Sequence, residues 1–582
     1  MLRFALLWLA VLACGCARKP AQQLSALSEE FVSTTLSFSP STATSAGLHE
    51  YKGRNLDDLL DDMSPEALDH HLRFYNDFQA RLAKLDPKTL SAEDRVDAAI
   101  LRDQAQLAQL DLGQIRTYLH NPTMYVETLG NALFAPLELE YAPFDDRMRH
   151  IIARLRGVPL FLDQASTNLV SAPGIWTKVA IQENAGNIEL VDKTIRQKVP
   201  AGLADTYKSA AGPALAAMRK FQDYLQNDLM TRDADWRLGR DLYFRKFSAT
   251  METGRDAEAM LADATRDLNT VRAQMLEIAL PLHREMEPSH KDHDELSGDD
   301  RINRVVGEVL DKIADRRSTP DSYMDDARHD LAEARAFVTQ KQLLTLPASA
   351  NLQVIPTPEF MRGIYSVGGF NPAPALEPQL GAFYWVTPIP AAWPADRVQS
   401  KLREYNFYKL KLLTLHEAIP GHYVQFEFAN RVQPRDRRLL RAVFGNGPYI
   451  EGWAQYAEQT MLDNGFQRSP EMALTFAKER LRVIANAILD VRLQMLNMTD
   501  QEALDLMEKQ AFQEPEEATE KLQRAKLSSC QLPDYYEGWS GWLRVRDEYR
   551  QKHGGTVNLA QFHDAALGEG AVPLSSLSEL LP

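Results

Sequence analysis

Apolar residues recur at every third or fourth position along most of the chain, a spacing typical of helices with one buried face. Ser64 and Ser91 each precede acidic residues and indicate helix starts, because a serine side chain can cap a first turn. The same apolar spacing predicts helical structure just before Ser64, at Leu56, Leu59, Leu60 and Met63. Later helices are predicted over residues 145–170, 174–195, 204–231, 253–284, 298–315 and 322–342. The predicted fold class is therefore mainly α.

The pattern changes between residues 350 and 395. Residues 352–355 and 382–387 are short, apolar and rich in aromatic or β-branched side chains, which predicts two strands. Between them lie Gly368 and Gly369 and several prolines. We expect a small antiparallel sheet in this region.

A long helix is predicted from Arg397 into the segment His416-Glu417-Ala418-Ile419-Pro420-Gly421-His422. A regular helix turns about 100° per residue, so it would point His416 and His422 roughly 240° apart. Proline removes a backbone donor and glycine permits unusual backbone angles. We infer that the helix breaks or bulges at Pro420-Gly421 and brings His422 back beside His416.

These residues are similar to the zinc peptidase pattern H-E-x-x-H, although the second histidine arrives two positions late. In that pattern two histidines bind the metal and the glutamate is the general base. The alternative is a helix end with two surface histidines. The leucine-rich approach to His416 favours a buried helix, and a buried Glu417 would need a partner or a metal.

Together, HEAIPGH at 416–422 and EGWAQYAE at 451–458 resemble a large bacterial family of secreted or lipid-anchored proteins. That family is placed by similarity among the Glu-zincin metallopeptidases and is named only as a domain of unknown function. Segments 38–51 and 562–574 are similar to its opening and closing signatures, so the resemblance covers about residues 30–580. A histidine frequent in the family near position 494 is Gln494 here, which puts a catalytic role for that position in doubt.

The resemblance implies a large helical zincin-like fold with an active-site cleft between two helical halves. It also implies one zinc ion per chain, bound by His416, His422 and Glu451, with Glu417 as general base acting on a water at the metal. Glu458 lies two turns after Glu451 on the same helix face, where it would orient a ligand histidine. The alternative for Glu458 is a surface carboxylate.

Related helical zinc peptidases donate a hydrogen bond from a tyrosine or histidine to the developing oxyanion. By this resemblance the candidates are Tyr535 and His563, with Tyr536 behind them. The alternatives are an aromatic core contact for either tyrosine and a helix-capping pair for His563 with Asp564.

In such peptidases a sheet edge pairs with the extended substrate backbone. The resemblance assigns this role to residues 383–386, which include Tyr384. Gly368 and Gly369 would then let a backbone come close to the substrate. The alternative is a packing hairpin with no substrate contact.

Near the N-terminus Arg3 is followed by an apolar run over residues 4–13, which is too short to span a bilayer and fits a secretory signal. Cys14 and Cys16 each follow a small residue, as acylation of a lipoprotein requires, and we favour Cys14. The predicted location is a lipid anchor facing the periplasm, with the outer membrane favoured. The alternative is a soluble periplasmic protein.

The net charge of −15 argues against nucleic acid as a partner, and membrane contact is expected only through the lipid anchor. Beyond the signal region the only cysteine is Cys530, so a disulfide framework within the folded part is excluded. The His- and acid-rich segment 290–295 is predicted to be a solvated loop between two helices.

One continuous domain is expected over about residues 30–580. Its predicted parts, after a signal peptide and lipobox at 1–16, are a tether at 17–25, a helical half at 26–348, a β region at 349–396 and a zinc-site helical half at 397–582.

These observations predict a zinc metallopeptidase, an exo- or oligopeptidase, whose substrates are short peptides. Two alternatives remain open. The first is a catalytically silent lipoprotein that binds peptides, and the second is a metal-dependent amidase that acts on a non-peptide amide.

Overall fold

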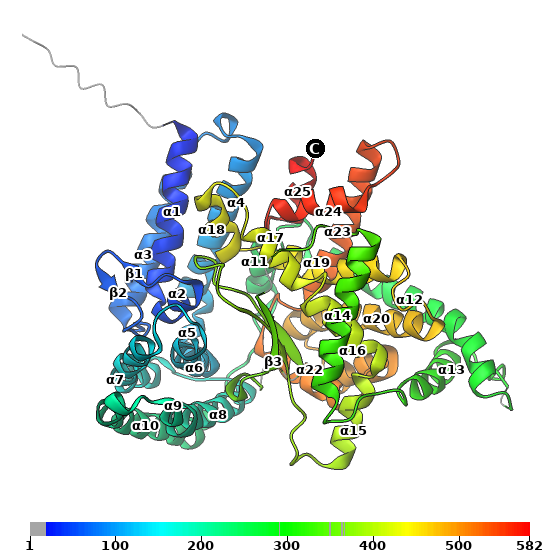
Figure 1. Cartoon of the computed structure of the whole chain (residues 1–582), viewed down its shortest axis with the longest axis horizontal. Helices are drawn as coiled ribbons and strands as arrows, with labels where there is room; N and C mark the ends of the chain where they lie inside the picture. Colours follow the sequence, from blue (N-terminus) through cyan, green and yellow to red (C-terminus); the bar gives the residue numbers. More distant parts are fainter. Residues whose placement is uncertain (1–18, 290, 349–350, 363–364, 366) are drawn as a thin grey trace, which may run out of the picture.

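The computed structural model describes residues 19–289, 291–348, 351–362, 365 and 367–582. The protein is mainly helical with two small sheets, as predicted (Figure 1). Cys14 and Cys16 lie outside the described residues, as does His290. No helix in the described ranges combines the length and apolarity that crossing a membrane requires.

The part of the chain before the main sheet is built from helices and one two-stranded hairpin. Their bounds are α1 (Pro20–Phe38), α2 (Pro40–Ala46), β1 (Glu50–Tyr51), β2 (Arg54–Asn55), α3 (Pro65–Leu82), α4 (Ala92–Leu110), α5 (Thr117–His120), α6 (Pro122–Glu138), α7 (Phe144–Asn168), α8 (Gly174–Glu189), α9 (Arg196–Lys198), α10 (Ala204–Asn227), α11 (Gly239–Met251), α12 (Ala257–Met286), α13 (Gly298–Ile313) and α14 (Tyr323–Lys341). The six later helices predicted from the sequence correspond to α7, α8, α10, α12, α13 and α14.

Two predicted helix starts are confirmed by their caps. The hydroxyl of Ser64 accepts a hydrogen bond from the backbone N–H of Ala67 at 3.3 Å. The hydroxyl of Ser91 accepts one from the N–H of Asp94 at 3.1 Å. Each serine satisfies a first-turn donor that has no partner within its helix.

Two local predictions are wrong. Helix α1 begins at Pro20, so most of the predicted tether is helical; proline is accommodated there because a first-turn N–H has no partner within the helix. The segment from Leu56 to Met63 is not helical. Instead the buried guanidinium of Arg154 donates to the backbone carbonyls of Leu56 and Leu59, at 3.3 and 3.0 Å, and holds them outside a helix.

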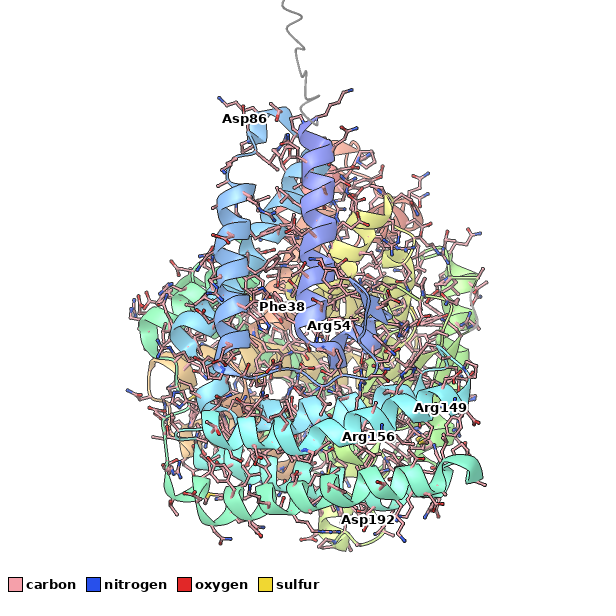
Figure 2. All side chains as sticks on the ribbon, turned by 90° about the vertical axis from the view of Figure 1, so that its left-hand side faces the viewer. Phe38, Arg54, Asp86, Arg149, Arg156 and Asp192 are labelled. Carbon is pink, nitrogen blue, oxygen red and sulfur yellow. The ribbon has the colours of Figure 1, made fainter. Side chains whose placement is uncertain are left out.

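The N-terminal helices occupy one side of the molecule and α12, α13 and α20 (Pro470–Met495) the other, with the main sheet between them (Figure 1). Figure 2 shows α7 and α10 running across the molecule below α1 and α3, with Arg149 and Arg156 of α7 on the outer surface. The opposite face of α7 packs into a separate core formed by α6, α7, α8 and α10.

The main sheet has three strands in the order β3 (Leu352–Pro356), β5 (Ala382–Val386) and β4 (Gly368–Asn371). Strand β3 pairs with β5 in parallel and β4 pairs with β5 antiparallel, so the sheet is mixed rather than antiparallel throughout. The long crossover from β3 to β5 permits the parallel pair.

After the sheet the described chain is again helical. The remaining bounds are α15 (Ala395–Glu404), α16 (Phe407–Glu417), α17 (His422–Ala429), α18 (Arg435–Val443), α19 (Gly447–Asp463), α20 (Pro470–Met495), α21 (Asp500–Asp505), α22 (Pro515–Leu527), α23 (Pro533–Lys552), α24 (Leu559–Gly568) and α25 (Leu574–Leu580).

The predicted long helix from Arg397 is two helices, α15 and α16. Asn406 starts the second because its side-chain oxygen accepts hydrogen bonds from the N–H groups of Tyr408 and Lys409, at 3.0 and 3.3 Å. This capping residue stops the first helix while the apolar spacing continues across the break.

The largest hydrophobic core contains side chains from Leu24 in α1 to Leu581 beside α25. The predicted helical halves therefore share a core. Helices α19 and α23 approach each other closely at Gly452 and Gly538, where a Cβ on Gly452 would lie 2.2 Å from the carbonyl carbon of Gly538. This close contact brings the helix with Glu451 against the helix with Tyr535.

Candidate metal centre

The helix that carries His416 ends one residue later, at Glu417, and a new helix begins at His422. A Cβ on Gly421 would lie 1.9 Å from the carbonyl oxygen of His416 and 2.4 Å from that of Leu415, so this turn requires glycine. The predicted break is confirmed. The two imidazole ring centroids lie 4.7 Å apart, with ring planes at 88°.

A tryptophan of the next motif fixes this turn. The indole N–H of Trp453 donates to the carbonyl oxygens of Pro420 and Gly421, at 2.9 and 3.3 Å. Trp453 is almost fully buried and lies two residues after Glu451 in α19. The turn between the histidines and the helix that supplies Glu451 are thereby held as one unit.

Three side chains converge beside the turn. Oε2 of Glu451 lies 3.5 Å from Nε2 of His416 and 3.4 Å from Nε2 of His422. One nitrogen or oxygen from each residue lies within 4.8 Å of the other two. Two imidazoles and one carboxylate therefore face a common point, the donor set of many zinc sites.

Two polar atoms of this group lack the hydrogen bonds that burial normally demands. Within the described residues, Oε2 of Glu451 and Nδ1 of His422 are buried and accept or donate no hydrogen bond. The unbonded carboxylate oxygen is the atom nearest both Nε2 atoms. A cation between the three side chains would satisfy this oxygen.

Negative charge dominates around the two rings. Burial lowers the pKa of His416, but the nearby Glu451 carboxylate, the hydrogen bond with Glu458 and the charge of Glu417 outweigh burial and raise the pKa to about 10. Burial raises the pKa of Glu451, but His416 and His422 outweigh it and hold that pKa well below its usual range. The surroundings thus favour a positive charge at this point, as a proton or as a metal ion.

Glu458 occupies the position predicted for it. Its Oε1 lies 2.8 Å from Nδ1 of His416, so the ring donates to the carboxylate and leaves Nε2 directed at Glu451. The side-chain amide of Gln455 donates to the same carboxylate oxygen, at 3.3 Å. Glu458 is 3 % exposed, which excludes the surface alternative. A carboxylate in this place fixes the tautomer and orientation of a ligand histidine.

Glu417 directly follows His416 and is partly buried. Its carboxylate forms no hydrogen bond or ion pair with the described residues. Its negative charge contributes to raising the pKa of both His416 and Tyr365. It is therefore a carboxylate beside the converging histidines that is not committed to a structural contact.

Tyr535 lies over the centre and Tyr536 does not. The ring of Tyr535 stacks on that of His416, with centroids 6.3 Å apart and planes at 22°. Burial and the charge of Glu451 raise the pKa of Tyr535 to about 12, so its hydroxyl stays protonated and can donate. Tyr536 faces the other way and donates to Asp267 at 2.7 Å.

The structure does not bring His563 to this group. Both of its ring nitrogens are engaged: Nδ1 lies 2.7 Å from the carbonyl oxygen of Leu343, and Nε2 lies 2.9 Å from the hydroxyl of Tyr456. The side chain is 1 % exposed, and burial lowers its pKa to about 4. His563 is a buried packing residue, and the oxyanion role predicted for it is wrong.

The side chain of Gln494 is likewise engaged in hydrogen bonds. Its side chain accepts from the N–H of Leu238 at 2.9 Å and donates to the carbonyl of Ser528 at 3.1 Å.

The predicted substrate strand is not an edge strand. Strand β5 is the middle strand of its sheet, so both of its backbone edges are paired. Tyr384 is completely buried and its hydroxyl lies 3.2 Å from that of Thr414 in α16. Tyr384 therefore anchors the sheet on the helix of the centre, and its predicted contact with substrate is wrong.

Gly368 and Gly369 belong to β4, which within the described residues pairs with β5 alone and is an edge strand. A Cβ on Gly368 would lie 2.5 Å from the carbonyl oxygen of Trp385, and one on Gly369 would lie 2.5 Å from the Tyr365 ring. These glycines allow close packing within the sheet. The next residue, Phe370, stacks near His422 with ring centroids 6.4 Å apart, so this edge runs beside the centre.

Sequence reasoning missed three neighbours of the centre: Gln455, Tyr365 and Arg524. Gln455 is four residues after Glu451, so helical spacing alone places both on one face. Tyr365 and Arg524 come from the sheet region and from α22. Arg524 donates to the hydroxyl of Tyr535 at 3.3 Å, and no local pattern connects it to the motifs.

A second group of possible metal ligands, His283, His293 and Glu308, joins α12 and α13. Glu308 Oε2 lies 2.9 Å from His283 Nε2 and 3.1 Å from His293 Nε2. The segment predicted to be a solvated loop thus contacts a buried histidine.

Two cavities lie elsewhere, one lined partly by α13, α15 and α20 and one beside the start of α8, and none of the ligand residues lines them. The predicted cleft over the centre stays a prediction.

The whole chain resembles two solved bacterial structures. One is "a putative lipoprotein of unknown function" from Shewanella oneidensis, with 27% identity and a TM-score of 0.77, covering 96% of this chain and 99% of the other. The second, "the putative lipoprotein" from Colwellia psychrerythraea, has 16% identity and a TM-score of 0.76, covers 97% and 99%, and shows the fold alone. No curated protein matches this chain.

Residues 40–581 match the family described as a bacterial protein of unknown function, DUF885. The matched range begins at the third residue of the predicted opening signature and includes both motifs and the closing signature. Since the match covers most of the chain, this protein belongs to the bacterial DUF885 family.

Proposed function

We propose that this protein is a zinc-dependent hydrolase that cleaves peptide bonds of short peptides. The observation that supports it most directly is the convergence of His416, His422 and Glu451, each of which offers a ligand atom within 4.8 Å of the other two. Glu417 follows the first ligand directly. A structural ion pair would not need an uncommitted carboxylate beside it.

The residues present fit the metal. Two neutral imidazoles and one carboxylate are the protein ligands of a catalytic zinc site that keeps a position open. The unbonded oxygen of Glu451 supplies the remaining acceptor, and Glu458 orients His416. When bound, zinc would supply Lewis-acid chemistry and a lowered pKa for water.

Glu417 is the proposed general base. Its carboxylate would take a proton from the attacking water as the water oxygen bonds to the peptide carbonyl carbon. The same carboxyl would return that proton to the amine nitrogen as the C–N bond breaks. One water is consumed, and the products are one free carboxylate and one free amine.

Tyr535 is the proposed oxyanion donor. Its hydroxyl keeps its proton, and its ring position is fixed by stacking on His416. A hydrogen bond donated to the developing oxyanion typically contributes about 2.7–4 kcal/mol to transition-state stabilisation. His563 is excluded from this role because both ring nitrogens are engaged.

The outer edge of β4 is the proposed support for an extended substrate. It belongs to the edge strand, and Phe370 in that strand lies beside His422. Backbone hydrogen bonds to a sheet edge hold a peptide with little dependence on its side chains. This edge replaces β5 in the sequence-based prediction.

Export and lipid anchoring through Cys14 form part of the proposal. The structures from Shewanella oneidensis and Colwellia psychrerythraea are both named as lipoproteins, and the apolar run before Cys14 is typical of a signal peptide. We propose a periplasm-facing protein anchored in the outer membrane.

The test is product analysis by mass spectrometry on a mixed pool of short peptides, with the protein zinc-loaded or stripped by a chelator. We expect cleavage that is lost on stripping and restored by zinc. Binding of peptides without cleavage would favour a silent binding protein. Cleavage confined to acylated amines in a parallel assay would favour a non-peptide amidase.

A further inference from the structure

An arginine beside the proposed centre has no acidic partner. Arg524 in α22 donates from Nη2 to Oε1 of Gln531 at 3.1 Å and to the hydroxyl of Tyr535 at 3.3 Å. It forms no ion pair with any carboxylate in the described part of the chain, and none of the remaining residues is Asp or Glu. Partly buried arginines are normally paired, so this charge is available to a ligand.

Three other cations in or beside α22 are paired. Lys526 lies 2.7 Å from Asp500, and Arg482 lies 2.8 Å from Glu517. Lys401 lies 3.0 Å from Glu520. Arg524 therefore differs from these three neighbours, each of which has a carboxylate partner.

Lys521 lies one turn before Arg524 and also has no ion pair within the described residues. Burial and the charges of Arg482 and Arg524 lower its pKa well below the usual range. Of these two cations, Arg524 is the one that contacts Tyr535.

Arg524 is one side chain away from the proposed metal ligands. Tyr535 contacts it through the hydroxyl, and the ring of the same tyrosine stacks on His416. The negative charge of Glu451 stabilises the charged form of Arg524, whereas the positive charge of Arg482 destabilises it. A guanidinium in this place presents a planar fork of donors that matches a carboxylate.

We propose that Arg524 binds the terminal α-carboxylate of the substrate peptide, which makes the enzyme a carboxypeptidase acting on peptides with a free C-terminus. This inference rests on the proposed function. A peptide advances at most about 3.6 Å per residue, so a terminal carboxylate held at Arg524 brings one of the last peptide bonds to the proposed metal ligands. The expected products are a C-terminal amino acid or dipeptide and a shortened peptide.

The experiment compares pairs of short peptides that differ only in their C-terminus, a free carboxylate or an amide. The ratio kcat/KM is measured for the zinc-loaded wild type, Arg524→Met, Arg524→Lys and the control Lys526→Met. The control removes a positive charge from the same helix, but its ammonium group pairs with Asp500 instead.

We expect the wild type to prefer the free acid by at least about 30-fold, the cost of leaving a buried charge unpaired. Arg524→Met should remove this preference, because kcat/KM on the free acid should fall about 30-fold more than kcat/KM on the amide. Arg524→Lys should retain part of the preference for the free acid. Lys526→Met should retain all of it. Melting temperatures of all four proteins establish that they fold.

Equal wild-type rates on acid and amide would overturn the carboxylate site and leave the peptidase proposal standing. An equal loss on both peptides in Arg524→Met would also overturn it, because Arg524 would then only position Tyr535. A wild type that cleaves no peptide in either form overturns the peptidase proposal and the carboxylate site with it.

Discussion

The carboxylate of Glu458 lies 2.8 Å from Nδ1 of His416, two helical turns after Glu451 on α19. One helix thus supplies both the proposed third ligand and the group that orients the first ligand. This arrangement requires α19 to lie along the turn between α16 and α17, where the Trp453 indole holds it.

Glu458→Gln should weaken zinc binding without removing it. The amide loses the charge that holds the imidazole in its ligand orientation, and changes of this kind typically cost about 10- to 100-fold in affinity. Competition with a chromogenic chelator measures the change. Glu471→Gln, in the first turn of α20, is the control and should bind like wild type. An unchanged affinity for Glu458→Gln would contradict the orienting role.

His422→Ala should reduce zinc from one ion per chain to nearly none. The remaining His416 and Glu451 provide only two of the three protein ligands that a catalytic zinc site uses. Metal content is measured by mass spectrometry after dialysis. His293→Ala is the matched control, because it also removes a histidine from a His–Glu cluster. We expect one zinc in that variant, and a loss there would assign the ion to the second cluster.

Glu417→Gln should keep the metal and lose the activity. The amide cannot accept the proton of the attacking water, and removal of a general base typically costs about 10²- to 10⁴-fold in kcat. The measurement is peptide turnover together with zinc content on the same sample. Turnover at the wild-type rate would show that another group is the base.

Gly421→Ala should destabilise the protein strongly. The added Cβ would lie 1.9 Å from the carbonyl oxygen of His416, so the turn would have to open. We expect a loss of about 3 kcal/mol or more in the free energy of unfolding, the upper end of overpacking costs. Gly212→Ala in α10 is the control, since its Cβ would meet nothing within 4 Å. That change should stabilise the helix by about 0.5–1 kcal/mol.

Asp490 should make stability depend on pH. Burial raises its pKa to about 6, against hydrogen bonds from the Tyr243 hydroxyl and the Cys530 N–H. The folded state therefore holds a proton that the unfolded state releases above about pH 4. Stability contributed by this proton is present at low pH and declines as pH rises toward 6, by about 1.4 kcal/mol per unit.

Asp490→Asn should abolish that decline, because its amide carries no charge at any pH and can still accept both hydrogen bonds. Urea unfolding between pH 4 and 7 measures the difference from wild type. Asp241→Asn, on the exposed first turn of α11, should leave the profile unchanged. Wild-type and Asp490→Asn profiles with the same slope in this window would refute the assignment.

Local patterns were reliable where short-range forces dominate. The six later helices, the serine caps and the break at Pro420-Gly421 follow from spacing, side-chain caps and backbone geometry within a few residues. The helix predicted at Leu56–Met63 is wrong because Arg154, distant in the chain, takes the carbonyl groups that a helix would use.

The order of the strands in the sheet could not be predicted from local patterns. The segments of β3 and β5 were recognisable, but composition does not reveal which strand lies in the middle. Tyr384 was therefore assigned to an edge that does not exist, whereas Phe370 of β4 lies beside His422.

The chain's residue pattern thus specified the helices, the order of the proposed ligands and the kink that lets two histidines meet. Packing between distant helices decided which aromatic group covers them: Tyr535 faces His416, while Tyr536 and His563 are engaged elsewhere. It also placed Arg524 next to Tyr535 without a carboxylate partner. The physical reason is that periodicity and capping act over one or two turns, whereas these neighbours are set by how whole helices bury their faces against one another.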